Sequence, residues 1–475
     1  MKAASLAGIG AATAAVAAGQ DFDPLKHLAG NGQWFSGRAL SHNGFGPNAF
    51  GIDPKAPEGC TVDQAAFVSR HGSRYPDPGA YAEWTALEAK IQAATFTTNA
   101  TELEFLHDWK PVLTDPSQQI SQLSLTGWKE LYDMGVQYRL NFPSFSGHNA
   151  PFTLWANEYA SSPRVLNSAQ LFARGYLGPN ATTLGSIYVV NGSAPASLAN
   201  SLATSNLCPA YSDNGGGDPK DEWDSTYLPP ATDRINALLR GNLTFSAADV
   251  GIFAYLCGFE TQITGARSPW CGTLTPHEFL QYEYAQDLRY WYGNGAGNGV
   301  AKATMLPFLQ GLVQRFRAGP GATYVDGDGA AWAPPRLVAA FTNDGQVSQL
   351  AAAVGVFDGL PDLPGDRLLA NRTFRASSFV TMRGTVGFER LNCGSTGTFL
   401  RVKLNDVVYP VSGCDGGPGR SCELEAYGEL IERKLEAVGG FREVCNVTDT
   451  TVPEGEEKTT FLWDRALSFE KLVRP

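Results

Sequence analysis

The chain has 475 residues, and its 36 lysines and arginines against 47 aspartates and glutamates give a formal net charge of −11. Hydrophobic residues make up 43 % of the sequence and charged residues 17 %, against roughly 25 % charged residues in an average soluble domain. The sequence is therefore too apolar and too weakly charged for intrinsic disorder, and it lacks the basic balance typical of nucleic-acid binders.

The first residues have the pattern of a secretory signal peptide. Lys2 precedes an alanine-rich apolar run that ends in Ala15-Val16-Ala17, which is typical of a cleavage site. The alternative is a flexible alanine-rich tail. We expect residues 1–19 to be a signal peptide and the protein to be secreted, extracellular or in the cell wall. No later apolar run has membrane length, so we expect no membrane partner.

Two further patterns favour secretion. Asn-x-Ser/Thr sequons are candidate glycosylation sites, and they occur at Asn99, Asn180, Asn191, Asn242, Asn371 and Asn446. An even number of cysteines without a CxxC pair is more typical of disulfides than of a zinc site; they are Cys60, Cys208, Cys257, Cys271, Cys393, Cys414, Cys422 and Cys445. Spacing alone leaves many pairings open, although Cys414 and Cys422 flank a turn-rich segment that could close on itself.

Apolar runs bounded by turn residues alternate with segments of helical spacing. In chain order we expect a strand at 63–69, a helix at 80–94, a strand at 152–156, helices at 162–176 and 276–290, a strand at 337–341 and a helix at 345–354. Later strands are expected at 379–382, 398–403 and 407–411, with a hairpin turn at Asn405-Asp406, and a last helix at 423–438.

Three strand-to-helix units predict an α/β fold with a central, mostly parallel sheet flanked by helices. Residues 178–330 are rich in glycine, proline and asparagine and contain helical segments, so we expect an inserted, mainly helical subdomain there. Residues 20–177 and 331–475 would then form the α/β catalytic domain. Open α/β sheets bind ligands at the carboxyl ends of their strands.

The strongest local signal runs from Arg70 to Pro76, directly after the first predicted strand. Two arginines flank His71 there, and a guanidinium fork binds phosphate with a charge that it never loses. The two cations lower the pKa of His71 and keep its imidazole neutral, which suits attack on phosphorus. The alternative is a surface cluster of arginines with a structural histidine.

The segment Arg70-His71-Gly72-Ser73-Arg74-Tyr75-Pro76 resembles the Arg-His-Gly-x-Arg-x-Pro signature of the histidine acid phosphatases, whose branch 2 includes phytases. Residues 161–169 resemble the segment that supplies a further phosphate-binding arginine, here Arg164. Residues 25–28, 32–37, 60–64 and 388–393 are also similar to the secreted fungal members. The resemblance implies a phosphoglycerate mutase-like fold and the disulfides Cys60–Cys393, Cys257–Cys271, Cys414–Cys422 and Cys208–Cys445.

The distal motif of this family is His-Asp after a strand, and the matching segment here reads Asn343-Asp344. The resemblance implies that Asp344 protonates the leaving alcohol and that Asn343 helps to bind phosphate through its amide. The alternative for Asn343 is a turn or helix N-cap residue without substrate contact. His107-Asp108 is the one His-Asp dipeptide in the chain, but it precedes Arg164 and lacks a strand before it, so we expect a helix-end or surface pair.

The other histidines, His27, His42, His148 and His277, show no metal-ligand spacing, and we expect no metal and no cofactor. The resemblance implies a secreted, metal-independent phosphomonoesterase, an acid phosphatase with phytase activity, in which His71 becomes phosphorylated. Its partners would be small phosphate monoesters such as phytate. A dedicated 3-phytase, a non-catalytic phosphate-ester binder and a mutase-like phosphotransferase remain alternatives.

Overall fold

The computed structural model describes residues 22–28, 50–147 and 149–475. The expected signal peptide at 1–19, the segment at 32–37, His42 and His148 lie outside the described residues, so the predictions made for them stay predictions. No helix in the described ranges is long and apolar enough to cross a membrane.

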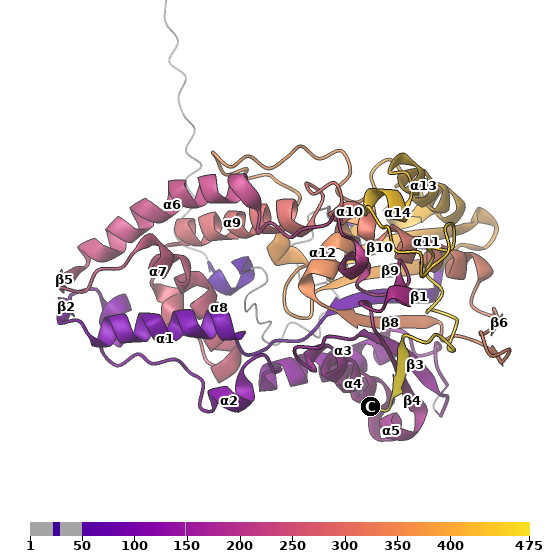
Figure 1. Ribbon diagram of the computed structural model, residues 1–475, viewed down its shortest axis with the longest axis horizontal. Coiled ribbons are helices and arrows are strands. Elements are labelled where there is room, and N and C mark those ends of the chain that lie inside the picture. The colour runs from indigo at the N-terminus through magenta and orange to yellow at the C-terminus, as the bar shows by residue number, and fades with distance from the viewer. Residues whose placement is uncertain (1–21, 29–49, 148) are drawn as a thin grey trace, which may run out of the picture.

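A mixed sheet lies at the centre of the larger part of the molecule (Figure 1). Among the described residues it has nine strands in the order β11-β10-β9-β1-β8-β3-β4-β13, with β12 beside β10. Their bounds are β1 (Thr61–Arg70), β3 (Phe152–Asn157), β4 (Gly185–Val190), β8 (Leu337–Thr342), β9 (Thr385–Asn392), β10 (Thr398–Leu404), β11 (Val407–Tyr409), β12 (Cys422–Glu423) and β13 (Glu470–Val473). The four strands β1, β8, β3 and β4 are parallel, and antiparallel partners flank them on both sides. The predicted α/β fold class is confirmed.

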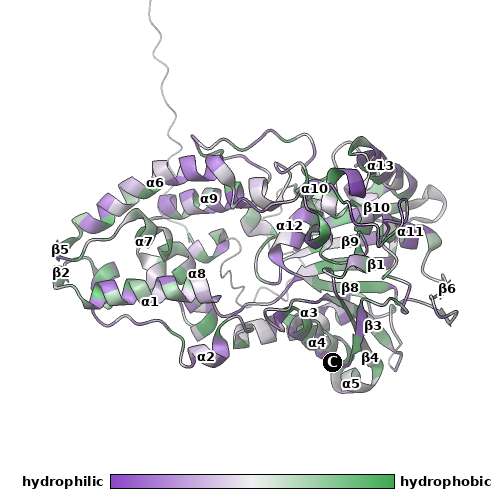
Figure 2. Cartoon of the chain, in the orientation of Figure 1, coloured by the Kyte–Doolittle hydropathy of each residue, from purple (hydrophilic) through white to green (hydrophobic). Residues whose placement is uncertain are grey.

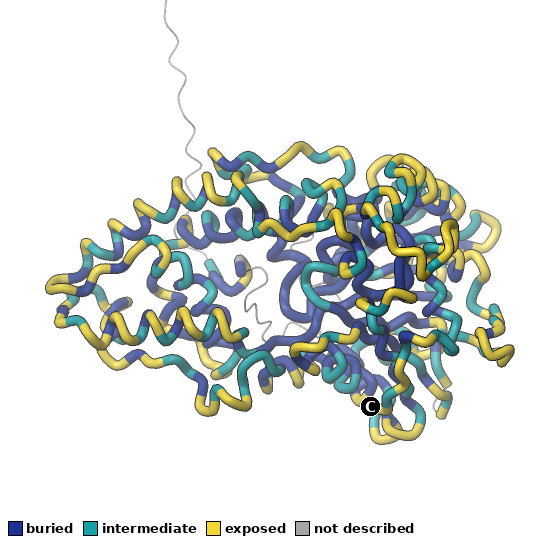
Figure 3. The backbone as a smooth tube through the Cα atoms, in the orientation of Figure 1, coloured by how far each residue is buried: buried dark blue, intermediate teal, exposed yellow. Residues whose placement is uncertain are grey.

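Helices cover both faces of this sheet, as the alternating side chains of β1 show. Ala65 and Phe67 pack with α3 (Leu125–Asn141) and α4 (Arg164–Leu177) on one face. Ala66 and Val68 face the opposite core, which contains α11 (Leu306–Ala318), α12 (Asp344–Ala353) and α13 (Leu424–Ala437). Because both faces are covered, the inner strand β8 is buried along its whole length and the neighbouring strands β1 and β3 along most of theirs (Figures 2 and 3).

A second, helical part lies beside the sheet, at the left of Figure 1. It has its own apolar core, which includes Trp84, Ile235 and Trp270. Its elements are α1 (Pro78–Gln92), β2 (Phe96–Thr98), α2 (Pro116–Gln119), α6 (Gly217–Ala237), β5 (Leu239–Gly241), α7 (Ala247–Gly251), α8 (Phe253–Thr264) and α9 (Pro276–Asn294). The shorter elements α5 (Ala181–Leu184), α10 (Ala301–Thr304), β6 (Tyr324–Val325), β7 (Ala331–Trp332) and α14 (Phe441–Val444) complete the set.

The expected domain boundaries at 178 and 331 stay a prediction. The structure assigns β4, which lies inside 178–330, to the central sheet, and α1, which lies outside that range, contributes Trp84 to the helical core. The helical core is therefore built from residues both inside and outside the range 178–330.

The four disulfides join Cys60 to Cys393, Cys208 to Cys445, Cys257 to Cys271 and Cys414 to Cys422, which are the pairs that the resemblance implied. The strand expected at Phe379–Met382 is wrong. That apolar segment is buried but forms turns, and β9 begins only at Thr385. Burial and apolar character made it look like a strand, although it has no ladder partner.

Candidate active site

The carboxyl ends of two neighbouring parallel strands bring the two predicted motifs together. β1 ends at Arg70 and β8 ends at Thr342, and these two residues are register partners. The residue directly after β1, His71, donates its backbone N–H to the carbonyl oxygen of Thr342 over 3.1 Å. The loops that leave both strands, with His71 on one and Asn343-Asp344 on the other, therefore start side by side.

The imidazole of His71 is 1 % exposed. Its Nδ1 lies 2.8 Å from the carbonyl oxygen of Gly72. A carbonyl oxygen only accepts, so Nδ1 carries the proton and donates it, which leaves a lone pair on Nε2. Burial, and after it the charges of three nearby arginines, lowers the pKa of His71 well below its usual value. The sequence prediction named only the cations, whereas burial is the larger cause. The ring is neutral and its second nitrogen is free to attack.

Arg70, Arg74 and Arg164 surround this ring and are 1 %, 8 % and 6 % exposed. They come from the end of β1, from the loop that follows it and from the first turn of α4. Nη1 of Arg70 is fixed by the carbonyl oxygen of Val380 at 2.8 Å. Burial lowers the pKa of Arg74 to about 10, so it remains charged in acid. We call these three side chains the arginine cage.

The Nε atoms of all three cage arginines are buried and have no hydrogen-bond partner among the described residues. An unsatisfied buried donor is costly, and one such group in a native structure needs an explanation. Three of them around one imidazole fit an anion with several acceptor oxygens, as a phosphate group has.

Asp344 begins α12 and faces the cage. Its Oδ2 lies 3.4 Å from Nη2 of Arg70, and it accepts a hydrogen bond of 2.8 Å from the hydroxyl of Tyr290 on α9. Burial would raise the pKa of Asp344, but the charge of Arg70 and further favourable contacts outweigh it and hold that pKa well below its usual value. With these partners the carboxyl is therefore ionised.

Asn343 occupies the N-cap position of α12, yet its side chain makes no capping hydrogen bond. Its Oδ1 is buried and has no partner among the described residues. Asn343 therefore occupies the N-cap position that the alternative interpretation gave it, but its side chain does not cap the helix. Its amide is left available for another contact.

The model of the histidine phosphatase superfamily, branch 2, matches residues 61–405, which is more than half of the sequence. The chain belongs to this family. Its members act through a phosphohistidine, and the chain is a phosphoric monoester hydrolase.

Curated relatives and solved structures agree with this membership. Acid phosphatase PHO1 of Komagataella pastoris is 28 % identical over 93 % of this chain and 90 % of its own length. Phytase PHO112 of Candida albicans is 26 % identical over 88 % of this chain and 87 % of its own. The crystal structure of the phytase from D. castellii has the same fold, with a TM-score of 0.78 and 24 % identity over 93 % of this chain and 90 % of that one.

In this histidine phosphatase, sequence reasoning missed several residues that hold the site. The hydroxyl of Ser168 accepts the backbone N–H of Gly72 at 3.1 Å, and Glu130 accepts from both the N–H and the hydroxyl of Ser73 at 2.9 Å. The Tyr290 hydroxyl contacts the Asp344 carboxyl, and the Asp77 carboxylate contacts two arginines of the cage. Of these residues only Asp77 has a local signal, since it lies three positions after Arg74.

The competing dipeptide His107-Asp108 lies in the helical part and is exposed. The ring of His107 stacks on Phe96 of β2 with 4.4 Å between the ring centroids. This contact agrees with the expected surface pair. His277 is exposed as well.

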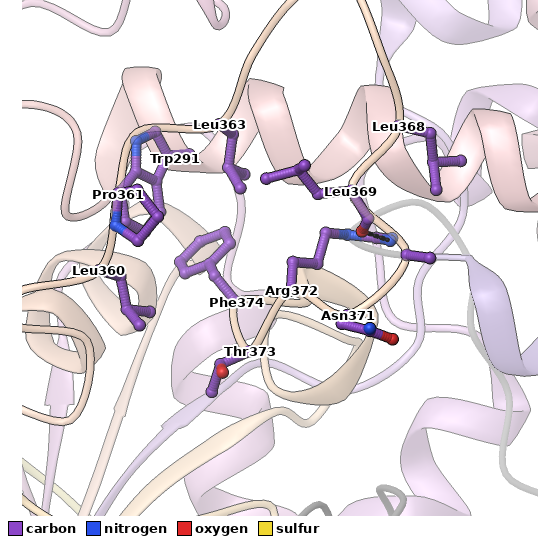
Figure 4. Close-up of a pocket in the computed structure, with 11 residues that line it drawn as sticks. Trp291, Leu360, Pro361, Leu363, Leu368, Leu369, Asn371, Arg372, Thr373 and Phe374 are labelled. Atoms are coloured by element: carbon purple, nitrogen blue, oxygen red, sulfur yellow. Dashed lines mark hydrogen bonds between the residues drawn. The ribbon is translucent and has the colours of Figure 1, made fainter. Parts of the chain in front are cut away.

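A pocket of about 330 Å³ lies beside α9 and is lined by apolar side chains such as Trp291, Leu363 and Phe374 (Figure 4). Its one charged lining residue, Arg372, is paired with Glu283 and Asp287. None of the six predicted catalytic and phosphate-binding residues lines this pocket. Its apolar wall does not suit a phosphate group.

Proposed function

We propose that the protein is a secreted, metal-independent acid phosphatase with phytase activity. The observation that carries the proposal is the free Nε2 of a neutral His71 inside three arginines whose buried Nε donors lack partners among the described residues. This arrangement supplies a nucleophile and a binding place for the transferred group at one point.

In the first step Nε2 of His71 attacks phosphorus in line, so that the N–P bond forms while the ester P–O bond breaks. Arg70, Arg74 and Arg164 donate to the non-bridging oxygens and stabilise their charge. Asp344 gives its proton to the leaving oxygen. Water then attacks phosphorus, the N–P bond breaks, and Asp344 takes a proton from that water.

Acid operation follows from the state of Asp344. Because its pKa is low beside the charge of Arg70, the carboxyl has to gain its proton when substrate binds. A phosphate group neutralises Arg70 and adds negative charge near the carboxyl, and both effects raise the pKa of Asp344. A monoester also retains its own second proton below about pH 6. Protonated Asp344 is therefore most populated in the complex at acid pH.

Three guanidiniums supply the positive charge that a metal ion supplies in other phosphoryl-transfer enzymes. The substrates would be small phosphate monoesters, and the phytases among the relatives and the solved structures support inositol phosphates as one group of them. The sequons and the four disulfides support export from the cell.

The test is hydrolysis of p-nitrophenyl phosphate and of phytate between about pH 2.5 and 7 with EDTA present. We expect turnover of both with an acid optimum, and a loss of about 10³-fold or more in His71→Ala, since the nucleophile is gone. His107→Ala, which removes an exposed histidine outside the cage, is the matched control and should retain wild-type turnover.

Each other outcome has a definite meaning. Substantial activity in His71→Ala rejects His71 as the nucleophile. Turnover of phytate alone favours a dedicated 3-phytase, and binding of phosphate without turnover of either ester favours a non-catalytic binding protein.

A further inference from the structure

Asp77 lies at the outer edge of the arginine cage. Its Oδ2 is 2.7 Å from Nη2 of Arg74 and its Oδ1 is 3.0 Å from Nη1 of Arg164. The hydroxyl of Ser121 donates to the same Oδ1 over 3.0 Å. The Asp77 side chain is 42 % exposed, whereas those of the two arginines are 9 % and 7 % exposed. The carboxylate is therefore fixed by donors from three segments, between the cage and solvent.

Helix capping does not explain why the Asp77 carboxylate lies against Arg74 and Arg164. Asp77 is the N-cap residue of α1, but its side chain makes no capping hydrogen bond, because the carboxylate contacts the cage instead. Asp115 stands in the same local context, before Pro116 at the start of α2 and also without a capping bond. No cage arginine pairs with Asp115 among the described ion pairs.

The charge of Asp77 persists in acid. Partial burial would raise its pKa, but Arg74 and Arg164 outweigh that effect and hold the pKa of Asp77 below its usual value. Beside the three positive charges of the cage, Asp77 thus places a negative charge at the outer edge that is retained to lower pH than that of an ordinary aspartate.

In the proposed mechanism the reacting phosphate binds the cage arginines, and the remainder of the substrate would extend toward solvent, to which the Asp344 and Asp77 side chains are both partly exposed. A simple monoester places no further anion there. An inositol polyphosphate places neighbouring phosphate groups there, and each is repelled by a carboxylate within a Debye length of about 8–10 Å.

We propose that Asp77 is a specificity-determining residue whose carboxylate, by occupying Arg74 and Arg164 at the mouth of the cage, biases the site toward esters with a single phosphate group. This inference rests on the proposed function and refines its substrate class. The protein is then an acid phosphatase first, and phytate is its poorer substrate for an electrostatic reason.

The test compares kcat/KM for phytate with kcat/KM for p-nitrophenyl phosphate at one acid pH and one ionic strength. We expect the ratio of phytate to p-nitrophenyl phosphate to rise about fivefold or more in Asp77→Asn, because the mouth gains net positive charge. Asp77→Glu keeps the charge and should stay within about twofold of wild type. Asp115→Asn removes the same charge from the matched N-cap and should also stay within about twofold.

Asp77→Ser provides a second neutral variant with a good N-cap residue, and competition by inositol hexasulfate against p-nitrophenyl phosphate provides a second measurement. Tighter hexasulfate binding in both neutral variants supports the proposal. An unchanged or lower ratio in active, folded neutral variants overturns it, as does an equal rise in Asp77→Glu. A wild-type protein without any phosphatase activity would instead reject the proposed function.

Discussion

The two oxygens of the Asp344 carboxyl have different surroundings. Both the Tyr290 hydroxyl and the Arg70 guanidinium contact Oδ2, so that oxygen accepts and has no room for a proton. A proton gained on substrate binding is therefore directed to Oδ1. In the proposed mechanism Tyr290 is a positioning residue, since it would act on the leaving group only through Asp344.

Replacement of Asp344 by asparagine separates proton donation from phosphate binding. Asp344→Asn keeps the size of the side chain but supplies no acidic proton, so we expect kcat for an alkyl ester such as glycerol phosphate to fall about 10²- to 10³-fold. For p-nitrophenyl phosphate, whose leaving group needs no proton, the loss should be about tenfold or less. The measurement is kcat for both esters at the same acid pH, and equal losses for both would argue against the acid role.

The signature loop owes its shape to one face of α3. Ser124, Gly127 and Glu130 stand three residues apart, and all three contact the backbone of Ser73 or hydrogen-bond to it. A Cβ atom on Gly127 would lie 1.9 Å from the carbonyl oxygen of Ser73. The helix approaches the loop this closely because that position has no side chain.

The substitution Gly127→Ala should therefore displace the loop that carries His71. We expect kcat for p-nitrophenyl phosphate to fall about 10²-fold and the melting temperature to drop. Gly251→Ala in α7 is the control, because a Cβ atom there meets only Leu228 at 3.8 Å, and alanine is the better helix former. Wild-type kcat in Gly127→Ala would show that the loop adapts without loss of geometry.

The sequence predicted the elements whose pattern is local. The strands at 63–69, 152–156 and 337–341 lie in β1, β3 and β8, because a short apolar run between turn residues reports a buried strand directly. The Asn405-Asp406 turn joins β10 to β11, and both residues have positive φ, as a two-residue hairpin requires.

The features that were not predicted from the sequence depend on contacts between segments that are far apart in the chain. Tyr290 meets Asp344 only because α9 packs against α12, and nothing near Tyr290 in the sequence indicates this. The short buried segment before Arg383 resembled a strand, yet the carbonyl oxygen of Val380 accepts a hydrogen bond from the Arg70 side chain and not from a neighbouring strand. Chain order, in contrast, was sufficient to prefer Asn343-Asp344 over His107-Asp108.

At the scale of the whole molecule, several buried carboxyls favour an acid environment. Burial raises the pKa of Glu260 to about 7 and, with the charge of Asp464 added, the pKa of Glu470 to about 9. A carboxyl whose pKa is higher in the folded than in the unfolded state binds a proton that the unfolded chain has already lost. The contribution of such groups is therefore complete below about pH 4.5 and is lost as the pH rises to the folded pKa.

Carboxyls of the opposite kind set the lower limit of this range. The pKa of Glu389 is lowered, because the charges of Lys403 and Arg401 outweigh its burial. Such a group stabilises the fold above its unfolded pKa, and that contribution is lost as the pH falls toward the folded pKa. From these two kinds of carboxyl we expect the stability maximum to lie in mild acid, where the proposed chemistry operates.

Glu470 on β13 offers the sharpest test of this pH dependence, because both of its carboxylate oxygens are buried and have no partner among the described residues. In Glu470→Gln nothing ionises at this position, so we expect the melting temperature at pH 7.5 to exceed that of wild type by roughly 2–5 °C, with the difference vanishing near pH 4.5. Calorimetry at a series of pH values measures this, with Glu456→Gln at an exposed loop position as the control. A gain in melting temperature that is the same at both pH values would mean that the substitution acts through packing of the edge strand β13 and not through the ionisation of Glu470.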